Sequence, residues 1–230
     1  MNQDNNLQDN YVIEDDEPES DGVTETNGAK QPEETEESPK KTKGCLLAMK
    51  LLLEVLLNPI DGWKRLRRAN YTPEEFARDC FYPLIALASA SCLMTCIYEA
   101  AITLSDAMME ALKFFVAFFF SNFLIIIFGN WVLPSETRIS MDSAFGKIFV
   151  MANLSTLALF SILYSTLPML TPVLLFLPLW TIYLTARGMR FFNLPPEKAN
   201  MTKTLVCVLI LGVPSLCYLG LDFLLEGVGV

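Results

Sequence analysis

The stretch Cys45–Arg68, CLLAMKLLLEVLLNPIDGWKRLRR, decides where the membrane begins in this chain. Its first thirteen residues place Leu, Val and Met around most of a helix, with Lys50 and Glu54 four residues apart on one face. A helix of this length extends about 20 Å, which is too short for the roughly 30 Å hydrocarbon core of a bilayer. We therefore expect an amphipathic helix at residues 45–57 that lies in the membrane interface.

The residues after this helix contain a helix stop, a tryptophan and a basic cluster, and they complete an interfacial segment at 45–81. Pro59 should end the helix, because proline lacks the backbone N–H and disfavours helical geometry at the residue before it. Trp63 is expected in the headgroup layer, as tryptophans often are. The basic cluster is expected to bind anionic lipid headgroups and consists of Lys64, Arg65, Arg67 and Arg68.

The net charge of −9 lies entirely at the N-terminus. Residues 1–44 contain 13 acidic residues and four lysines, and the rest of the chain has equal numbers of acids and bases. A segment this polar cannot bury enough apolar surface to offset the entropy lost on ordering. Residues 1–44 are therefore predicted to form a disordered acidic tail.

The remaining sequence is dominated by apolar blocks, and 52% of the whole chain is hydrophobic. This composition predicts an all-α integral membrane protein in which residues 82–225 form five transmembrane helices. The predicted spans cover residues 82–102, 112–133, 144–166, 171–186 and 204–225, and they leave a short C-terminus at 226–230.

The charges between the spans predict the orientation. Basic residues cluster on the side of the N-terminus: Lys64, Arg65, Arg67, Arg68, Arg78, Arg138, Lys147, Arg187, Arg190, Lys198 and Lys203. The opposite side has Lys113 as its only base, against Glu99, Asp106, Glu110, Asp222 and Glu226. By the positive-inside rule, we expect a protein of the inner (cytoplasmic) membrane with a cytoplasmic N-terminus and an external C-terminus.

The sequence has few residues suited to catalysis or metal binding. It contains no histidine, which removes the commonest general base and transition-metal ligand. Cys92 and Cys96 continue a ladder of small residues that favours close helix packing over metal binding. We expect no cofactor, no metal and no catalytic residue. An intramembrane enzyme would need converging ionisable groups, and Glu99 with Asp222 is the candidate pair.

Four polar residues lie in the middle of predicted spans: Asn122, Asn153, Ser155 and Thr156. They would line the path of a small-solute or lipid transporter if they faced a common interior. The other interpretation is hydrogen bonding between helices, which is common in membrane proteins and contributes about 1 kcal/mol per contact. No charged residue accompanies these four, so we favour the second interpretation.

Several short motifs resemble the YIP domain family, and specifically its prokaryotic branch, over about residues 50–225. They occur in the family's order: Asn58-Pro59-x-x-Gly62-Trp63, Tyr82-Pro83, Phe145-x-x-Ile148-x-x-x-Ala152, Leu179-Trp180-x-x-Tyr183-Leu184, Gly188-Met189 and Glu197-Lys198-Ala199. The resemblance implies five helices, a cytoplasmic N-terminus and no catalytic residue. Eukaryotic members act as trafficking scaffolds that contact Rab GTPases, but their Asp-Leu-Tyr-Gly-Pro signature is absent here, so Rab binding is not carried over.

The main functional hypothesis is a non-enzymatic membrane scaffold or assembly partner. Its partners would be an unidentified membrane or cytoplasmic protein, or a second copy of the chain. The motif residues are given structural roles. Trp63, with Gly62 beside it, and Trp180 would be bilayer anchors. Pro59 would form the bend after the first helix. Pro83 would start the first span, and Gly188 would be the point where the fourth helix leaves the membrane.

Overall fold

The computed structural model describes residues 44–98, 102–167, 169, 171–174, 176–192, 194 and 196–228. These residues form helices and connecting segments and contain no β-strand. The fold class is therefore all-α over the described part of the chain. The predicted acidic tail lies outside the described residues except for Gly44, and Glu99 also lies outside them.

The N-terminal described segment is a pair of short helices, α1 (Cys45–Leu57) and α2 (Pro59–Arg68). The helix predicted at 45–57 is confirmed with the same bounds. Pro59 follows its end but also opens α2, because the first turn of a helix does not need the N–H that proline lacks. Gly62 lies where the two helices meet, since an added Cβ there would be 2.4 Å from the Val55 Cα.

Within the described residues, four helical segments are long and apolar enough to cross a membrane, so the protein is a membrane protein. The first, Pro73–Tyr98, is assembled from α3 (Pro73–Phe76), the π-helical turn η1 (Ala77–Phe81), α4 (Tyr82–Ser91), the 3-10 turn η2 (Cys92–Met94) and α5 (Thr95–Tyr98). The others contain α6 (Leu104–Val132), α8 (Ala144–Thr166) and α11 (Ala199–Val228). Thr72 and Glu75 form a capping box at the start of the first segment, as their spacing predicts.

The predicted fourth span at 171–186 is not one of these four long helices. This region forms α9 (Thr171–Leu174) and α10 (Leu177–Gly188), and a twelve-residue helix extends only about 18 Å. The remaining short elements are α7 (Ser135–Asp142), η4 (Met189–Phe191) and η5 (Pro196–Lys198). Four of the five predicted spans thus correspond to helices of spanning length.

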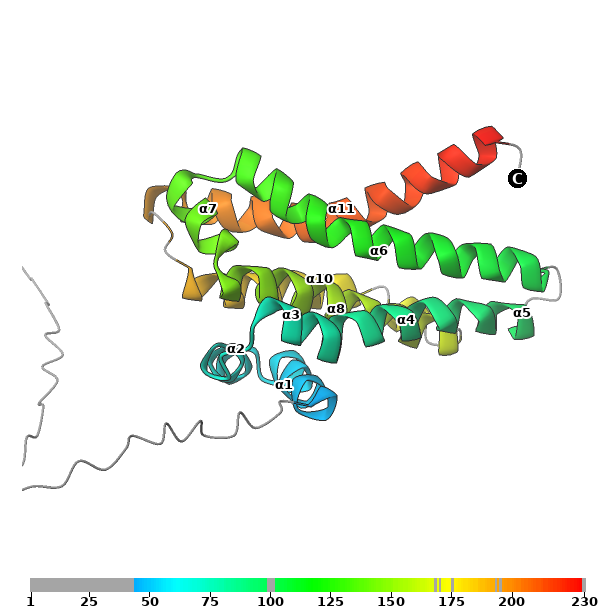
Figure 1. The fold of residues 1–230 in the computed structure, drawn as a ribbon, viewed down its shortest axis with the longest axis horizontal. Helices are drawn as coiled ribbons and strands as arrows, with labels where there is room; N and C mark the ends of the chain where they lie inside the picture. The colour runs from blue at the N-terminus through cyan, green and yellow to red at the C-terminus, as the bar shows by residue number, and fades with distance from the viewer. Residues whose placement is uncertain are drawn as a thin grey trace, which may run out of the picture. The chain divides into compact units, whose positions relative to one another are not determined.

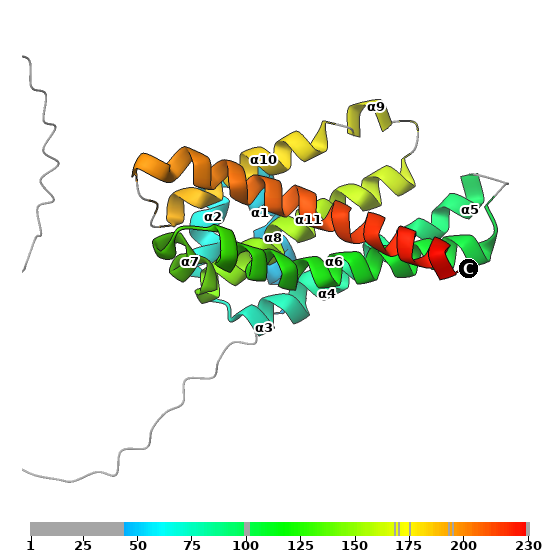
Figure 2. The same ribbon diagram turned by 90° about the horizontal axis from the view of Figure 1, so that it is seen from above.

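The helices are arranged as an antiparallel bundle (Figures 1 and 2). Both views show α4, α8 and α11 running in one direction and α6 and α10 in the other. The chain therefore returns through α9 and α10 between the end of α8 and the start of α11. The two ends of the bundle are called here the α2 end, where α6 ends and α8 and α11 begin, and the α5 end, where α6 begins and α11 ends.

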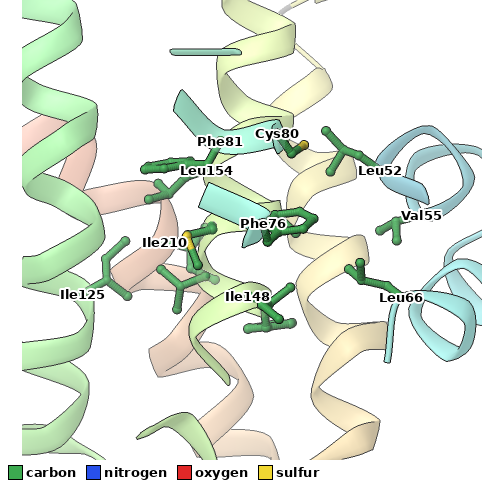
Figure 3. Packing of buried hydrophobic residues seen from close by; sticks show 14 of the residues in the cluster. Leu52, Val55, Leu66, Phe76, Cys80, Phe81, Ile125, Ile148, Leu154 and Ile210 are labelled. Atoms are coloured by element: carbon green, nitrogen blue, oxygen red, sulfur yellow. The ribbon is translucent and has the colours of Figure 1, made fainter. Parts of the chain in front are cut away.

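Helix α8 lies at the centre of the apolar core. Its most apolar stretch is 61% buried, whereas the other three long segments are 28–33% buried. Figure 3 shows side chains from most of the bundle converging around it: Leu52, Val55, Leu66, Phe76, Cys80, Phe81, Ile125, Ile148, Leu154 and Ile210. Helices α1 and α2 contribute to this core, so they are packed onto the long helices and belong to the same folded unit.

Candidate functional site

The side chain of Trp63 joins α2 to the membrane helices. Only 1% of it is exposed, and its indole Nε1 donates a hydrogen bond to the Leu184 carbonyl of α10 over 3.1 Å. Its ring centroid lies 5.1 Å from that of Phe149 in α8. This corrects the prediction that Trp63 lies in the headgroup layer as a bilayer anchor. The ring is enclosed by protein because α1 and α2 fold back onto α8 and α10.

Trp180 makes the reciprocal connection, from α10 to α1. Its Nε1 donates to the Leu56 carbonyl over 3.1 Å, and its side chain remains 40% exposed. The Leu56 carbonyl is one of the last four of α1, which have no partner within their own helix. Trp180 therefore satisfies a helix end while it holds α10 against α1. We call the two hydrogen bonds made by Trp63 and Trp180 the tryptophan clamp.

Gly188, the last residue of α10, makes room for this clamp. An added Cβ at Gly188 would lie 2.5 Å from Cε2 of Phe149 and 2.8 Å from Cε2 of Trp63. Real Cβ atoms do not approach other atoms this closely, so a side chain here would displace the two rings. Helix α10 ends at Gly188, and the structure adds a packing reason for the glycine; the exit of a fourth span from the membrane at this residue stays a prediction.

Pro83 lies near the start of α4, directly after the π-helical turn η1. Proline cannot donate to the carbonyl four residues before it, and a π turn is a usual place for such a displaced helical bond. Pro83 is exposed and takes no part in the tryptophan clamp. The prediction that the first span starts at Tyr82-Pro83 is wrong, because the continuous helical segment of spanning length already begins at Pro73.

The four polar residues predicted in mid-span do not share one cavity. Asn153 is buried between α8 and α10, where its Nδ2 donates to the Phe149 carbonyl over 2.8 Å and its Oδ1 lies 2.9 Å from the Thr185 hydroxyl. Thr156 donates to the Ala152 carbonyl of its own helix, and Ser155 is fully buried. Asn153 and Thr156 are three residues apart and lie on one side of α8, whereas Ser155 points about 200° away from Asn153.

Asn122 lies apart from those three, on α6. It lines a cavity of about 350 Å³ near the α2 end, together with Lys147 and Glu74. A transport path through Asn122, Asn153, Ser155 and Thr156 would require that all four side chains face the same interior. The structure brings Asn153 to Thr185 and leaves Asn122 in a separate place, so these residues do not form one path.

A cluster of charged side chains joins α6 to α11 near the α5 end. The Lys113 Nζ lies 2.7 Å from Asp222 Oδ1 and 2.5 Å from Glu110 Oε1, and the Tyr218 hydroxyl donates to Glu110 Oε2. The Lys113 side chain is only 10% exposed, whereas the two carboxylates are about 40% exposed. We call Glu110, Lys113, Tyr218 and Asp222 the α6–α11 charge cluster.

Sequence reasoning did not predict this cluster. It paired Asp222 with Glu99, which lies outside the described residues, and placed Lys113 at a span end where it would reach the surface. The sequence did contain one indication of the cluster, which is the spacing of its residues within each helix. Glu110 and Lys113 are three apart on α6, and Tyr218 and Asp222 are four apart on α11, so each pair shares a face. Nothing in the sequence near Lys113 or Asp222 indicated that these two residues, 109 positions apart, would be in contact.

Two further observations concern metal coordination and similarity to known proteins. Within the described part of the chain, no three or more Cys, Asp or Glu side chains are arranged to hold a metal ion. Comparison of the chain with models of known protein families, with curated proteins and with solved structures finds no match. The resemblance to the YIP domain family therefore stays a prediction based on the motifs.

Proposed function

We propose that this protein is a non-enzymatic, YIP-like membrane scaffold that presents the α1–α2 helix pair to a partner at the cytoplasmic surface. The tryptophan clamp carries this proposal. Two indole N–H groups, one from each side, fix the helix pair to α10, and α8 packs behind Trp63. A surface element held in one orientation by specific contacts is suited to recognition, because little further ordering is needed on binding.

Five membrane crossings are part of the proposal. Helices α8 and α11 run in the same direction (Figure 2), so the segment between them must return across the bundle. Helices α9 and α10, with the residues that join them, supply this return. Although α10 alone is shorter than the bilayer core, Thr171–Gly188 together contain enough residues for a crossing.

The proposed orientation places the α2 end in the cytoplasm and α1 in the interface. The last turn of α2 carries Arg65, Arg67 and Arg68, as the positive-inside rule requires of the cytoplasmic side. On α1, Leu46 and Leu57 are 83% and 80% exposed while the opposite face packs on the core. Exposed leucines beside the membrane helices support contact with lipid and hence an interfacial position.

The basic residues of α2 divide into two groups under this proposal. Arg65 forms an ion pair with Glu54 of α1 at 3.0 Å, and the Arg67 guanidinium lies 5.7 Å from the centroid of the Phe145 ring. These contacts hold α2 on the protein. Lys64 and Arg68 are exposed, and we propose that they contact anionic headgroups or an acidic partner.

Chemical crosslinking in intact membranes, followed by mass spectrometry, tests the scaffold. We expect the wild-type chain to retain one protein in near-stoichiometric amount. Trp63→Ala should lose that partner, while Trp131→Ala, at an exposed position of α6, should keep it. Where Trp63→Ala does not accumulate, Trp180→Phe serves instead, because it removes only the N–H that reaches Leu56.

The result contrary to the scaffold is a chain that crosslinks to itself alone. That result would favour the alternative of a small-solute or lipid transporter. A form lacking residues 1–44, run beside the intact chain, tests the predicted tail separately. Loss of the partner from this form alone would assign the binding to the tail and not to the α1–α2 pair.

A further inference from the structure

A second part of the molecule, separate from the α1–α2 helix pair, contains a cavity that resembles a ligand-binding site. A cavity of about 710 Å³ lies between α6, α8 and α11, and Cys92 and Pro178 complete its wall. This volume falls within the roughly 300–1,000 Å³ typical of small-molecule sites. Most of the lining is apolar, with Phe114 and Phe118 from α6 and Leu211 from α11.

The charged side chain of the cavity lies toward one end. Glu110 and Tyr218 line it, and behind them Lys113 bridges Glu110 and Asp222. With one ammonium and two carboxylates, the α6–α11 charge cluster carries a net charge of −1. Although Glu110 already contacts Lys113 and Tyr218, each carboxylate oxygen has two lone pairs and can accept a further hydrogen bond. The cavity therefore offers a negative acceptor to a cationic donor.

The order of residues along the helices gives the cavity a direction. On α6, Glu110 lies near the helix start, and Phe114 and Phe118 follow one and two turns deeper. On α11, Tyr218 is nearer the α5 end and Leu211 is deeper. The polar end thus lies toward one membrane surface and the apolar end toward the bilayer centre. An amphiphile in the surrounding leaflet has the same polarity.

The rim indicates that the ligand arrives from the membrane. Tyr164 of α8 and Leu219 of α11 line the cavity and are 52% and 61% exposed, in segments of spanning length. The opening is therefore apolar and faces the region that lipid chains occupy. Ser161 and Ser165 of α8 also line the cavity and offer hydroxyl donors to phosphate or ester oxygens.

We propose that this cavity binds one phospholipid with a primary ammonium headgroup, of the phosphatidylethanolamine class. The ammonium donates to Glu110, and an acyl chain lies along Phe114, Phe118 and Leu211. A choline headgroup has no N–H to donate to the carboxylate. A purely anionic headgroup brings a second negative charge to a cluster that already carries one.

Native mass spectrometry of the full-length chain, equilibrated with lipids of identical chains, tests the assignment. Phosphatidylethanolamine should be retained about tenfold more strongly than phosphatidylcholine or phosphatidylglycerol, as expected for one charge-assisted hydrogen bond. Glu110→Gln should remove most of this preference. Ser161→Phe should fill the cavity and reduce retention of all three lipids. Glu197→Gln, an exposed acid at the α2 end, is the matched control and should behave as wild type.

Several results would overturn the proposal. Equal retention of the choline lipid, preferred retention of the glycerol lipid, or no retained lipid would each do so, and these comparisons need only the wild-type chain. An unchanged preference in a folded Glu110→Gln protein would remove the carboxylate from the site. A long-chain primary amine that binds where the phospholipid does not would show that the site takes a fatty amine.

Discussion

At the α2 end of the bundle, Trp63 and Asn153 are buried polar side chains with partners on α10. Trp63 reaches the Leu184 carbonyl, and Asn153 lies between the Phe149 carbonyl and the Thr185 hydroxyl. Near the α5 end, Lys113 holds two carboxylates beside a cavity of about 710 Å³. Around Gly62 and Gly188 the first region has no space for an added methyl group, whereas the second has a cavity and an excess negative charge. The contrast separates a part built for rigidity from a part that can accept a ligand.

The largest effect is expected from Gly62→Ala, at the contact of α1 and α2. The new Cβ would lie 2.4–2.6 Å from backbone atoms of Val55 and Glu54, which cannot move aside as a side chain can. Because backbone must move, we expect destabilisation well beyond the roughly 1–3 kcal/mol typical of overpacking, greater than that of Trp63→Ala, and loss of most folded protein. Gly220→Ala is the control, because no atom lies within 4 Å of its Cβ. Yield after size-exclusion chromatography and thermal unfolding by circular dichroism measure both.

Trp63→Ala should come next. It removes a fully buried ring and the hydrogen bond to Leu184, and large-to-small aromatic substitutions typically cost about 3–5 kcal/mol. Trp131→Ala changes a side chain that is 86% exposed and should have little effect. Hydrogen exchange should show faster exchange in residues 45–68 of the Trp63 variant. Unchanged protection there would mean that Trp63 does not hold the helix pair.

Lys113→Met tests the charge cluster by leaving two neighbouring carboxylates without their cation. We expect a loss of about 1–3 kcal/mol, below the roughly 3–5 kcal/mol of fully buried pairs, because Glu110 and Asp222 are partly exposed. Thermal unfolding of Lys113→Met, Asp222→Leu and the double variant forms a double-mutant cycle, which measures the coupling energy between the two side chains. Additive losses would show that the two side chains are not coupled.

The smallest effect is expected from Arg65→Gln at the exposed ion pair with Glu54. Pairs of this kind contribute about 0–1 kcal/mol and are screened by salt. Unfolding of the variant and the wild type should therefore differ slightly at low salt and coincide at high salt. A large difference that persists in salt would place part of the rigidity of the α2 end in this ion pair and not in the tryptophan clamp.

The features that were predictable depend on short stretches of chain. The helix at 45–57 has the predicted bounds because Pro59 acts on its immediate neighbours. The predicted fourth span shows the limit of such reasoning. Its apolar composition was read correctly, but it forms α9 and α10, and the direction of the chain through them becomes clear only beside α8 and α11.

For the candidate sites, the sequence indicated some of the important residues but did not indicate which groups they contact. Gly62, Trp63, Trp180 and Gly188 were selected from the sequence as structural residues. Lipid was expected around Trp63, which is instead enclosed by protein, whereas Trp180 is 40% exposed and also donates a hydrogen bond to α1. Aromatic residues near a membrane surface are equally compatible with a lipid layer and a protein interior, because both are apolar with polar groups nearby.

By itself, the amino-acid sequence determined the helical class, the membrane-spanning composition and the end of the first helix, because these follow from hydropathy and backbone geometry within a few turns. The tertiary structure alone decided which groups meet. Trp63 lies 121 residues from its acceptor, and Lys113 lies 109 residues from Asp222. Contacts at this separation depend on how the helices pack, so the tryptophan clamp and the charged end of the cavity exist only in the folded bundle.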